Sequence, residues 1–600
     1  MPSPNSFSRP TLRVGNFSAF LGDRADALEE VLEDDVDVLV GDYLAELTML
    51  VLRKNEMRGG TGYAGRFIEH MAGSIERIAE RKVKVIANAG GLDPEACAKA
   101  LRTLCAERGV ELTIAAVVGD NLRDDLGAVL GDTPVVTNLD TGQDLDLSNH
   151  EVLTANAYLG AWPIVEALNA GADIVVCPRM TDASLVVGPA AWKFGWTRDD
   201  WNQLAGAVVA GHLIECNSFV TGANFALFDE YEDLGMPGCP IAEIAEDGSS
   251  VITKTSHSDG IVVVDSVKAQ LFYEVQSTRY YNPDVTVDLT SVQLKEIGHN
   301  RVQVSAVQGT IPTPTTKLSL TYEGGYRNTM TIGITGRKVQ AKLAWLRRQV
   351  EQAVGKPAEF DAFRWTTVGP ATETGGSLEE STALAVITAR DTDRKKVGRK
   401  GFSDPIVALG IRSIPGFYLT TPPQAERLYG VQWPCLVPKE HIHVKVRIDG
   451  RDEITVPWGP AQVEPKVDVA TARTSAELAS QVGESTTLAP LGELVATRSG
   501  DKGGTANVGV WVRSEDAYQW LTTYLTPDRI HQLLPETRGQ KVERYEFSNL
   551  LGLNFLIRGF LEDGVSSCTR LDAQAKGLGE YLSAQLAPIP TALLVGQHTV

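Results

Sequence analysis

The spacing of apolar residues predicts alternating strands and helices over roughly the first 225 residues. Apolar runs at residues 36–42 and 83–91 are typical of buried strands, and residues 65–82 between them carry apolar side chains at helical spacing. The alternation continues with strands at residues 111–121 and 172–182 and helices at residues 93–109 and 158–171. Strands joined by helices of this length predict an α/β fold with a doubly wound, mostly parallel sheet.

After about residue 225 the pattern changes to shorter, less regular strands, which continue the main domain as a β-rich region. A long helix is expected at residues 337–355 and a β-hairpin around Asp449 and Gly450. Residues 461–490 are polar and alanine-rich, which is typical of a linker. The remaining residues predict a small α+β domain of ferredoxin-like type. We therefore expect a main domain at residues 10–465, a linker at 466–486 and a ferredoxin-like domain at 487–592.

Composition and charge exclude several classes of partner. A chain of 600 residues is long enough for two or three domains. Lys and Arg number 56 and Asp and Glu number 76, so the net charge is −20, and no basic stripe favours nucleic acid. No apolar run reaches the ~18 to 20 residues of a membrane helix. We therefore expect a cytoplasmic protein with neither a nucleic-acid nor a membrane partner.

Cysteine and histidine spacing argues against a metal site. The 7 cysteines are scattered, and no two of them form a CxxC pair, so neither a disulfide framework nor a zinc ribbon is expected. His441 and His443 share one face of a predicted strand but have no cysteine or acidic cluster nearby. The N-terminal residues also lack the apolar segment of a signal peptide. These patterns indicate a reducing compartment and no bound metal.

Polar side chains follow four of the predicted strands, namely Asp42, Asn88, Asp120, and Arg179 with Asp182. In a doubly wound sheet, ligands bind outside the carboxyl ends of the strands, so we expect these residues to converge on one cleft. Gly90 and Gly91 would offer backbone N–H groups to an anion there. The alternative is that each polar residue only caps a helix or a turn. Neither a Walker loop nor a GxGxxG motif indicates nucleotide binding.

The stretch AGHLIECNSFVTGANF places three reactive side chains on one predicted helix face. His212, Glu215 and Cys216 are three and four residues apart, so a helix would bring them together. They could form a cysteine nucleophile with a histidine, an acid/base carboxyl, or part of a metal site. For Cys216 we favour a small apolar residue at a buried helix end. Glu215 is the candidate acid/base group, because an apolar cleft would raise its pKa.

The stretch RSGDKGGTAN, residues 498–507, combines charged side chains with three glycines before an apolar strand. One interpretation is a glycine-rich hairpin that carries a solvated ion pair between Asp501 and Lys502. The other is anion recognition by Arg498, Lys502 and glycine N–H groups, with Ser499 or Asp501 transferring a proton. The glycines in question include Gly503 and Gly504. We expect this segment to reach the cleft of the main domain, in the same chain or in a neighbouring one.

Several longer stretches are distinctive, among them GDYLAELTM, NAGGLDP, LTANAYLGAWPIVEALNAGADIVVCPRMTDASLVVGP, AGHLIECNSFVTGANF, VKAQLFYEV and YNPDVTVDL. Through them the chain resembles the acyclic terpene utilisation (AtuA-like) family from about Val14 to about Val456. The stretch ATRSGDKGGTANVGVWV is similar to the ferredoxin-like domain that accompanies the family. The resemblance implies a role like that of the namesake, in a bacterial pathway that degrades citronellol and geraniol through branched acyl-CoA thioesters.

From this resemblance we expect an enzyme of acyl-CoA or branched carboxylic acid catabolism, a hydratase or lyase. Lys502 would hold phosphate or carboxylate while Asp501, Glu215 or Asp182 moves protons. One alternative is a thioester hydrolase that uses Cys216 or Ser499. The other is a non-catalytic acyl-CoA-binding or scaffold subunit of a degradative complex.

No redox or nucleotide motif requires a cofactor, so coenzyme A would enter only as part of the substrate. The expected partner is a small molecule, an acyl-CoA or a carboxylate. We also expect a homo-oligomer, because the β-rich region offers strand edges that need cover and intracellular enzymes of this size commonly assemble symmetrically.

Overall fold

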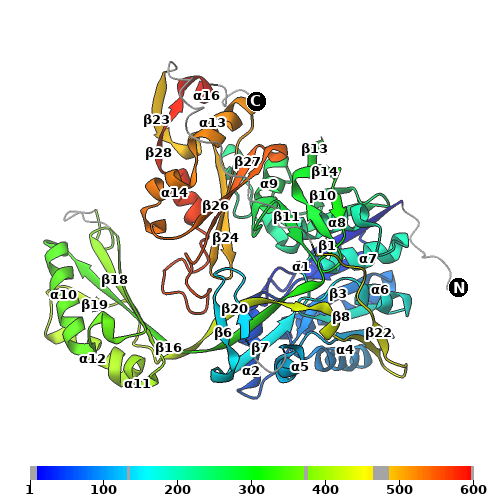
Figure 1. The fold of residues 1–600 in the computed structure, drawn as a ribbon, viewed down its shortest axis with the longest axis horizontal. Coiled ribbons are helices and arrows are strands. Elements are labelled where there is room, and N and C mark those ends of the chain that lie inside the picture. The colour runs from blue at the N-terminus through cyan, green and yellow to red at the C-terminus, as the bar shows by residue number, and fades with distance from the viewer. Residues whose placement is uncertain (1–9, 131–134, 370–375, 464–484, 596–600) are drawn as a thin grey trace.

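The computed structural model describes residues 10–130, 135–369, 376–463 and 485–595 (Figure 1). Within these residues the largest sheet has 11 strands. Its centre is parallel, and antiparallel strands extend it at both ends. The strands are, in spatial order, β13 (Gln293–Gly298), β14 (Arg301–Ser305), β10 (Ser250–Lys254), β9 (Pro240–Ala245), β1 (Thr11–Asn16), β2 (Val38–Gly41), β3 (Lys84–Gly91), β8 (Ile174–Pro178), β4 (Ile114–Val118), β21 (Val444–Ile448) and β22 (Ile454–Val456).

Helices cover both faces of the parallel centre, because its strands are apolar on both sides. Val85 and Ile86 are neighbours on β3 and belong to two different cores, as the two-residue period of a strand requires. The helices α3 (Gly65–Arg81) and α4 (Pro94–Arg108) share the core of Val85. The helices on the face of Ile86 are α6 (Trp162–Asn169), α7 (Ser184–Phe194) and α8 (Trp201–Glu215). The predicted α/β class is confirmed, and its doubly wound part is the parallel centre of a mixed sheet.

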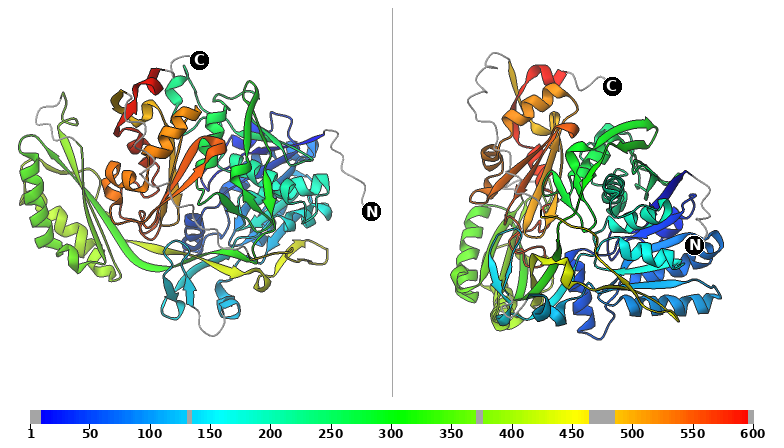
Figure 2. Two further views of the ribbon diagram at one scale, coloured as in Figure 1. Left: turned by 45° about the horizontal axis from the view of Figure 1, so that its top comes forward. Right: turned by 45° about the vertical axis from the view of Figure 1, so that its right-hand side comes forward.

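A second sheet forms an arm that projects from the rest of the chain (Figures 1 and 2). It is built on β16 (Thr315–Thr335), which pairs near its start with β7 (Val152–Ala157) and over most of its length with β20 (Arg427–Pro438). The far half of β16 pairs with β18 (Thr382–Asp391) and packs with α10 (Val339–Val354) around a separate core. The arm is therefore anchored in the main domain by the first residues of β16.

The C-terminal α+β domain has a four-stranded antiparallel sheet in the order β24 (Ala496–Lys502), β25 (Thr505–Trp511), β27 (Gly552–Ile557) and β26 (Val542–Phe547). The helices α13 (Glu515–Tyr524) and α15 (Leu578–Ser583) share its core. The sheet also packs against α9 (Val264–Phe272) of the main domain, where the rings of Phe272 and Trp511 stack with centroids 5.9 Å apart. The two domains therefore share an apolar interface.

Glycines in the C-terminal sheet make this close approach possible. A Cβ atom on Gly500 would lie 2.2 Å from Cε2 of Tyr273, and one on Gly509 would lie 2.3 Å from Cβ of Phe272. Both distances are far below van der Waals contact, so any side chain there would force the domains apart. RSGDKGGTAN forms a glycine-rich β-hairpin, as one of its two interpretations predicted. Residues 498–502 belong to β24, and only Gly503 and Gly504 separate β24 from β25.

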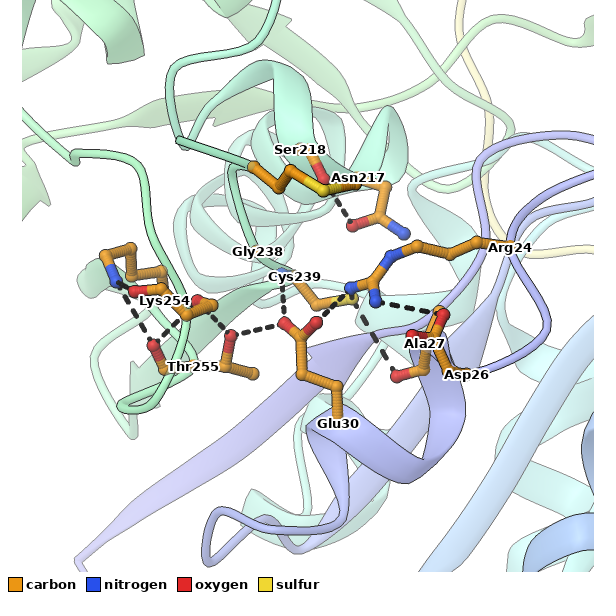
Figure 3. A network of polar contacts seen from close by, with 12 residues as sticks. Arg24, Asp26, Ala27, Glu30, Asn217, Ser218, Gly238, Cys239, Lys254 and Thr255 are labelled. Carbon is orange, nitrogen blue, oxygen red and sulfur yellow. Dashed lines mark hydrogen bonds and ion pairs between the residues drawn. The ribbon is translucent and has the colours of Figure 1, made fainter. Parts of the chain in front are cut away.

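A partly buried set of polar side chains that we call the Glu30 network ties α1 (Ala27–Val31) to the main sheet (Figure 3). It consists of Arg24, Glu30, Cys239 and Thr255. The Glu30 carboxylate accepts hydrogen bonds from Thr255 Oγ1 at 2.6 Å and from the Cys239 backbone N–H at 2.8 Å, and it also pairs with Arg24. Burial alone would raise the pKa of Glu30, but these hydrogen bonds lower it.

Other predictions from the sequence have mixed outcomes. The hairpin around Asp449 and Gly450 is confirmed by the pairing of β21 with β22, and the helix predicted at 337–355 is α10. In the described part of the chain, no helix combines the length and apolarity needed to cross a bilayer. The domain limits at 10–465 and 487–592 stay a prediction. Most of the linker predicted at 466–486 falls on residues 464–484, which lie outside the described residues.

Candidate functional site

The polar residues at the strand ends come together at the carboxyl edge of the parallel strands. Asn88 Nδ2 donates a hydrogen bond of 2.5 Å to Asp42 Oδ1, which joins the ends of β3 and β2. The backbone N–H of Arg179 donates to Asp120 Oδ2 at 3.2 Å, and its Nη1 donates to Asp182 Oδ1 at 2.8 Å. Asp42 also interacts electrostatically with Asp182 and Arg179. The predicted convergence of these residues is confirmed.

Arg179 is the central cation of this edge and is only 2% exposed. Its guanidinium carbon lies 4.2 Å from the ring centroid of Tyr158, and its Nη1 also donates to the Leu44 carbonyl at 2.8 Å. The Tyr158 hydroxyl donates to Glu46 Oε1 at 2.8 Å, at the start of α2 (Glu46–Glu56). Lys317 Nζ donates to the same oxygen at 2.7 Å. Because Lys317 belongs to β16, the arm supplies a cation to the edge of the main sheet.

The C-terminal domain supplies Lys502 to the same place. Lys502 Nζ lies 3.0 Å from Glu274 Oε2, just after α9, and its side chain is 20% exposed. Burial alone would lower the pKa of Lys502, but Glu274, Glu46 and the neighbouring Tyr280 and Tyr158 raise it well above its usual range. RSGDKGGTAN thus reaches these main-domain residues within one chain, whereas its reaching a cleft stays a prediction. The solvated ion pair with Asp501 is wrong, because Lys502 pairs with Glu274.

We call the whole assembly the central cluster. Its residues are Asp42, Glu46, Asn88, Asp120, Tyr158, Arg179, Asp182, His212, Glu215, Glu274, Tyr280, Lys317, Asp501 and Lys502.

At the C-terminal end of α8, His212 and Glu215 lie together, as their spacing predicts. His212 Nδ1 is 3.2 Å from Glu215 Oε1, and His212 Nε2 is 2.9 Å from the carbonyl oxygen of Gln270. A carbonyl oxygen only accepts hydrogen bonds, so Nε2 carries a hydrogen. Without a further proton between Nδ1 and the carboxylate, two lone pairs would face each other. The pair therefore holds a proton in a buried position, and burial raises the pKa of Glu215 despite the proximity of His212.

Two carboxylates of the central cluster stay ionised because a lysine stands beside each. Burial alone would raise the pKa of Glu46, but Lys317 first and then Lys502 lower it well below its usual range. Burial would also raise the pKa of Glu274, and again Lys502 is the main group that lowers it. These ion pairs fix cations in the interior of the site.

Three aspartates of the central cluster have raised pKa values instead. Burial, followed by the negative charge of Asp182, raises the pKa of Asp42 well above its usual range. Burial raises the pKa of Asp120 to about 7, and burial together with Glu274 raises the pKa of Asp501 to about 7. The site therefore combines fixed cations with carboxyl groups that hold or exchange a proton near neutral pH, an arrangement suited to general acid/base catalysis.

Arg498 and Lys576 lie beside this cluster and contact Tyr273. The Arg498 guanidinium carbon is 4.5 Å from the ring centroid of Tyr273 and 4.3 Å from that of Phe219. Arg498 Nη1 donates to the Asn224 carbonyl at 3.0 Å, and Lys576 Nζ contacts the Tyr273 hydroxyl. Both cations line a cavity of about 270 Å³ between the two domains. Arg498 is therefore placed for binding, as predicted, but beside the cavity rather than within the central cluster.

The two predicted nucleophiles lack the arrangement of an activated nucleophile. Ser499 Oγ donates to the Ala575 carbonyl at 2.6 Å and accepts from the Gly579 N–H at 2.8 Å, so its hydroxyl fixes the chain before α15. No histidine or carboxylate in the described part of the chain hydrogen-bonds to that oxygen. Burial raises the pKa of the Cys216 thiol well above its usual value, which disfavours the thiolate. These environments favour a structural role for Ser499 in place of the catalytic one, and for Cys216 they agree with the small apolar role that the sequence favoured.

The anion-binding role predicted for four glycines is likewise corrected to a packing role. A Cβ atom on Gly90 would lie 2.7 Å from a backbone oxygen of β8, and one on Gly504 would lie 2.3 Å from a backbone carbonyl oxygen. Gly91 and Gly503 have φ values of 53° and 63°, so they serve turns that favour glycine. The nearest neighbour of a Cβ on Gly503 is a carboxylate oxygen of Asp140, at 2.8 Å. A carboxylate in that place disfavours a bound anion.

Sequence reasoning missed five members of the central cluster. Tyr158 directly follows β7, so the rule that selected the other strand ends could have found it. Lys317 is a lysine within a largely buried strand, which is an unusual position that invites a search for a partner. The other three have no local signal, since only the fold brings them to the site. The missed residues are Glu46, Tyr158, Glu274, Tyr280 and Lys317.

Comparison with protein-family models gives two matches that together span most of the chain. Residues 12–448 match the acyclic terpene utilisation family protein AtuA, and residues 489–587 match the AtuA ferredoxin-like domain. The chain belongs to the AtuA family. The central cluster draws on both matched regions, because Asp501 and Lys502 fall in the second one and its other residues in the first. A search of curated proteins finds no match.

Membership of the AtuA family connects the chain with acyclic terpene utilisation, a catabolic pathway. Over the residues that the structure covers, no group of three or more His, Cys, Asp or Glu could hold a metal ion. The expectations of no metal, no cofactor and a homo-oligomer stay predictions. In this AtuA-family chain the site presents carboxyls, a histidine and fixed cations.

Proposed function

We propose that this protein is a hydratase or lyase that acts on a branched acyl-CoA thioester or a related carboxylic substrate. The observation that supports this most is a proton-bearing carboxyl, Asp501, that interacts electrostatically with Glu274, the carboxylate paired with Lys502. The family supports a substrate from acyclic terpene catabolism. An acid and a fixed cation in one site can supply the proton and the charge stabilisation that addition of water to a conjugated thioester uses.

In the hydration direction, water adds across the double bond next to the thioester. Glu215 Oε2, a buried atom with no hydrogen-bond partner among the described residues, accepts a proton from water while the water oxygen bonds to the β-carbon. Asp501 donates its proton to the α-carbon. Lys502 stabilises the negative charge that develops on the thioester oxygen in between. Glu215 and Asp501 then exchange protons with solvent, so the product differs from the substrate by one water, and the reverse sequence is the lyase reaction.

The experiment is an incubation of the pure protein with a panel of straight and branched enoyl-CoA thioesters, followed by mass spectrometry of the products. We expect a gain of one water and, in heavy water, one deuterium retained on the α-carbon. Glu107→Gln is a matched control for Glu215→Gln, because Glu107 is an exposed residue on α4. Water addition that survives in Glu215→Gln at the rate of the control would contradict the role of Glu215.

The same products distinguish the alternatives. A free acid would indicate a thioester hydrolase, although neither Ser499 nor Cys216 has the environment of a nucleophile. Tight binding of the thioester without any product would indicate a binding or scaffold subunit. Either result rejects the hydratase.

A further inference from the structure

The cavity of about 270 Å³ lies at the boundary between the two AtuA domains. Tyr273 and Glu274 connect it to the central cluster, because Tyr273 contacts Arg498 and Lys576 while Glu274 pairs with Lys502. The residues that line it are Gly222, Asn224, Phe225 and Phe228 from the main domain, and Thr497, Arg498, Ser499, Lys576, Gly579 and Glu580 from the C-terminal domain.

Arg498 lines this cavity and also carries an unsatisfied hydrogen-bond donor. The residue is 6% exposed, and its Nη2 is buried without a hydrogen-bond partner among the described residues. Thr497 Oγ1, from the adjacent lining residue, is also buried and unpartnered within the same part of the chain. Buried donors without partners are rare in folded proteins, and they indicate a place where a missing acceptor binds.

The positive charge of the cavity is only partly compensated, because Glu274 interacts electrostatically with both Arg498 and Lys576. Arg498 lies against the faces of Phe219 and Tyr273, and Lys576 contacts Tyr273. Within the described residues, neither cation forms an ion pair with a carboxylate. Glu580 is the one carboxyl among the lining residues, and it is exposed. Aromatic faces thus hold the two cations in place without neutralising them.

We propose that this cavity binds a phosphate group, namely one carried by the coenzyme A portion of the substrate. The identity of the carrier rests on the proposed function, whereas the phosphate site itself does not. A guanidinium with free N–H groups and a second cation match the charge and geometry of a phosphate dianion better than those of a carboxylate. The volume is at the lower limit for ligand pockets and suits one phosphate group rather than a whole nucleotide. The exposed Phe228 marks the side from which the carrier enters.

The test is calorimetric binding of inorganic phosphate and of coenzyme A to the full-length protein. The variants are Arg498→Lys, which loses the guanidinium fork, and Lys576→Met, with Lys99→Met on the exposed side of α4 as the matched control. We expect phosphate to compete with coenzyme A, and each site variant to weaken both ligands by about tenfold or more. Lys99→Met should bind like the wild type. Thermal unfolding checks that each variant is folded.

The proposal is overturned if phosphate does not bind the wild type, if acetate competes with coenzyme A as well as phosphate does, or if both site variants bind phosphate like the wild type. A failure of the proposed function can be distinguished from a failure of the phosphate site. Phosphate binding that is lost in Lys576→Met, together with no turnover of any enoyl-CoA, keeps the phosphate site and rejects the hydratase.

Discussion

The Glu30 network and the central cluster both hold charged side chains away from solvent at least in part, but they differ in whether hydrogen bonds outweigh the effect of burial on the carboxyl pKa. Glu30 accepts hydrogen bonds from Thr255, Cys239 and Arg24, and its pKa is lowered although burial opposes this (Figure 3). In the central cluster, burial prevails at Asp501, whose pKa rises to about 7. The carboxylate of the Glu30 network therefore stays ionised, whereas Asp501 of the central cluster can exchange a proton.

The difference teaches how to separate structural from functional polar groups in this fold. Where hydrogen bonds and a cation outweigh burial, as at Glu30, the carboxylate stays ionised and stabilises its surroundings. Where burial outweighs the donors, as at Asp120, the carboxyl keeps a proton near neutral pH, which costs stability but provides an acid or base. The two regions should thus respond in opposite ways to substitution and to pH.

The largest effect is expected for Glu215→Gln. The amide keeps the shape of the carboxyl but cannot exchange a proton, so kcat should fall by about 10²–10⁴. The fall in kcat is measured by steady-state kinetics on the enoyl-CoA that mass spectrometry identifies as the substrate, with Glu107→Gln as the control. A kcat equal to that of the control would show that Glu215 has no part in the reaction. Glu215 and Glu30 would then not differ in function.

The next largest effect is expected on the pH dependence of the free energy of unfolding, and Asp501→Asn should abolish it. The folded pKa of Asp501 is about 7, above the unfolded value of about 3.9, so the folded state binds the proton more tightly. Its contribution to stability is present below pH ~4 and is lost as the pH rises to about 7, with a slope of up to about 1.4 kcal/mol per pH unit. Urea unfolding from pH 4 to pH 8 should show this loss in the wild type and not in Asp501→Asn. Parallel curves for the two proteins would contradict it.

A smaller effect of opposite sign is expected for Glu30→Gln. Loss of a charged hydrogen-bond acceptor should lower the free energy of unfolding by about 1.5–3 kcal/mol at neutral pH. Because the folded pKa of Glu30 is lowered, its contribution is present above the unfolded value of about 4.3 and is lost as the pH falls further. Urea unfolding at two pH values measures both, and kcat should stay unchanged. A variant that keeps its stability but loses turnover would assign the Glu30 network to function.

The smallest effect is expected for Cys216→Ser. The thiol is held protonated by burial, so it contributes packing and no chemistry. Turnover should change by no more than about twofold, the scale of a substitution without a specific mechanism. Kinetics on the same substrate measures it, and a large loss of turnover with an unchanged melting temperature would restore the cysteine as a catalytic residue.

The parallel core, its helices and the polar strand ends could be predicted from local patterns. Asp42, Asn88, Asp120 and Arg179 follow apolar runs, and the geometry of parallel strands brings such positions to one edge. The arm built on β16 could not be predicted in this way. Two pairing partners of β16, β7 and β20, lie a hundred residues or more away along the chain, one on each side, so no local period reveals them.

The sequence by itself determined which residues meet by local geometry. Helical spacing brings His212 to Glu215, and the alternation of strands and helices brings the strand ends together. Only the tertiary structure decided the partners and the protonation of the site. Lys317 arrives from the arm, Lys502 arrives from the C-terminal domain, and Ser499 is diverted into a structural hydrogen bond. The physical reason is that burial and neighbours distant in sequence set the pKa and the role of a side chain. Neither its burial nor those neighbours can be inferred from the residues next to it along the chain.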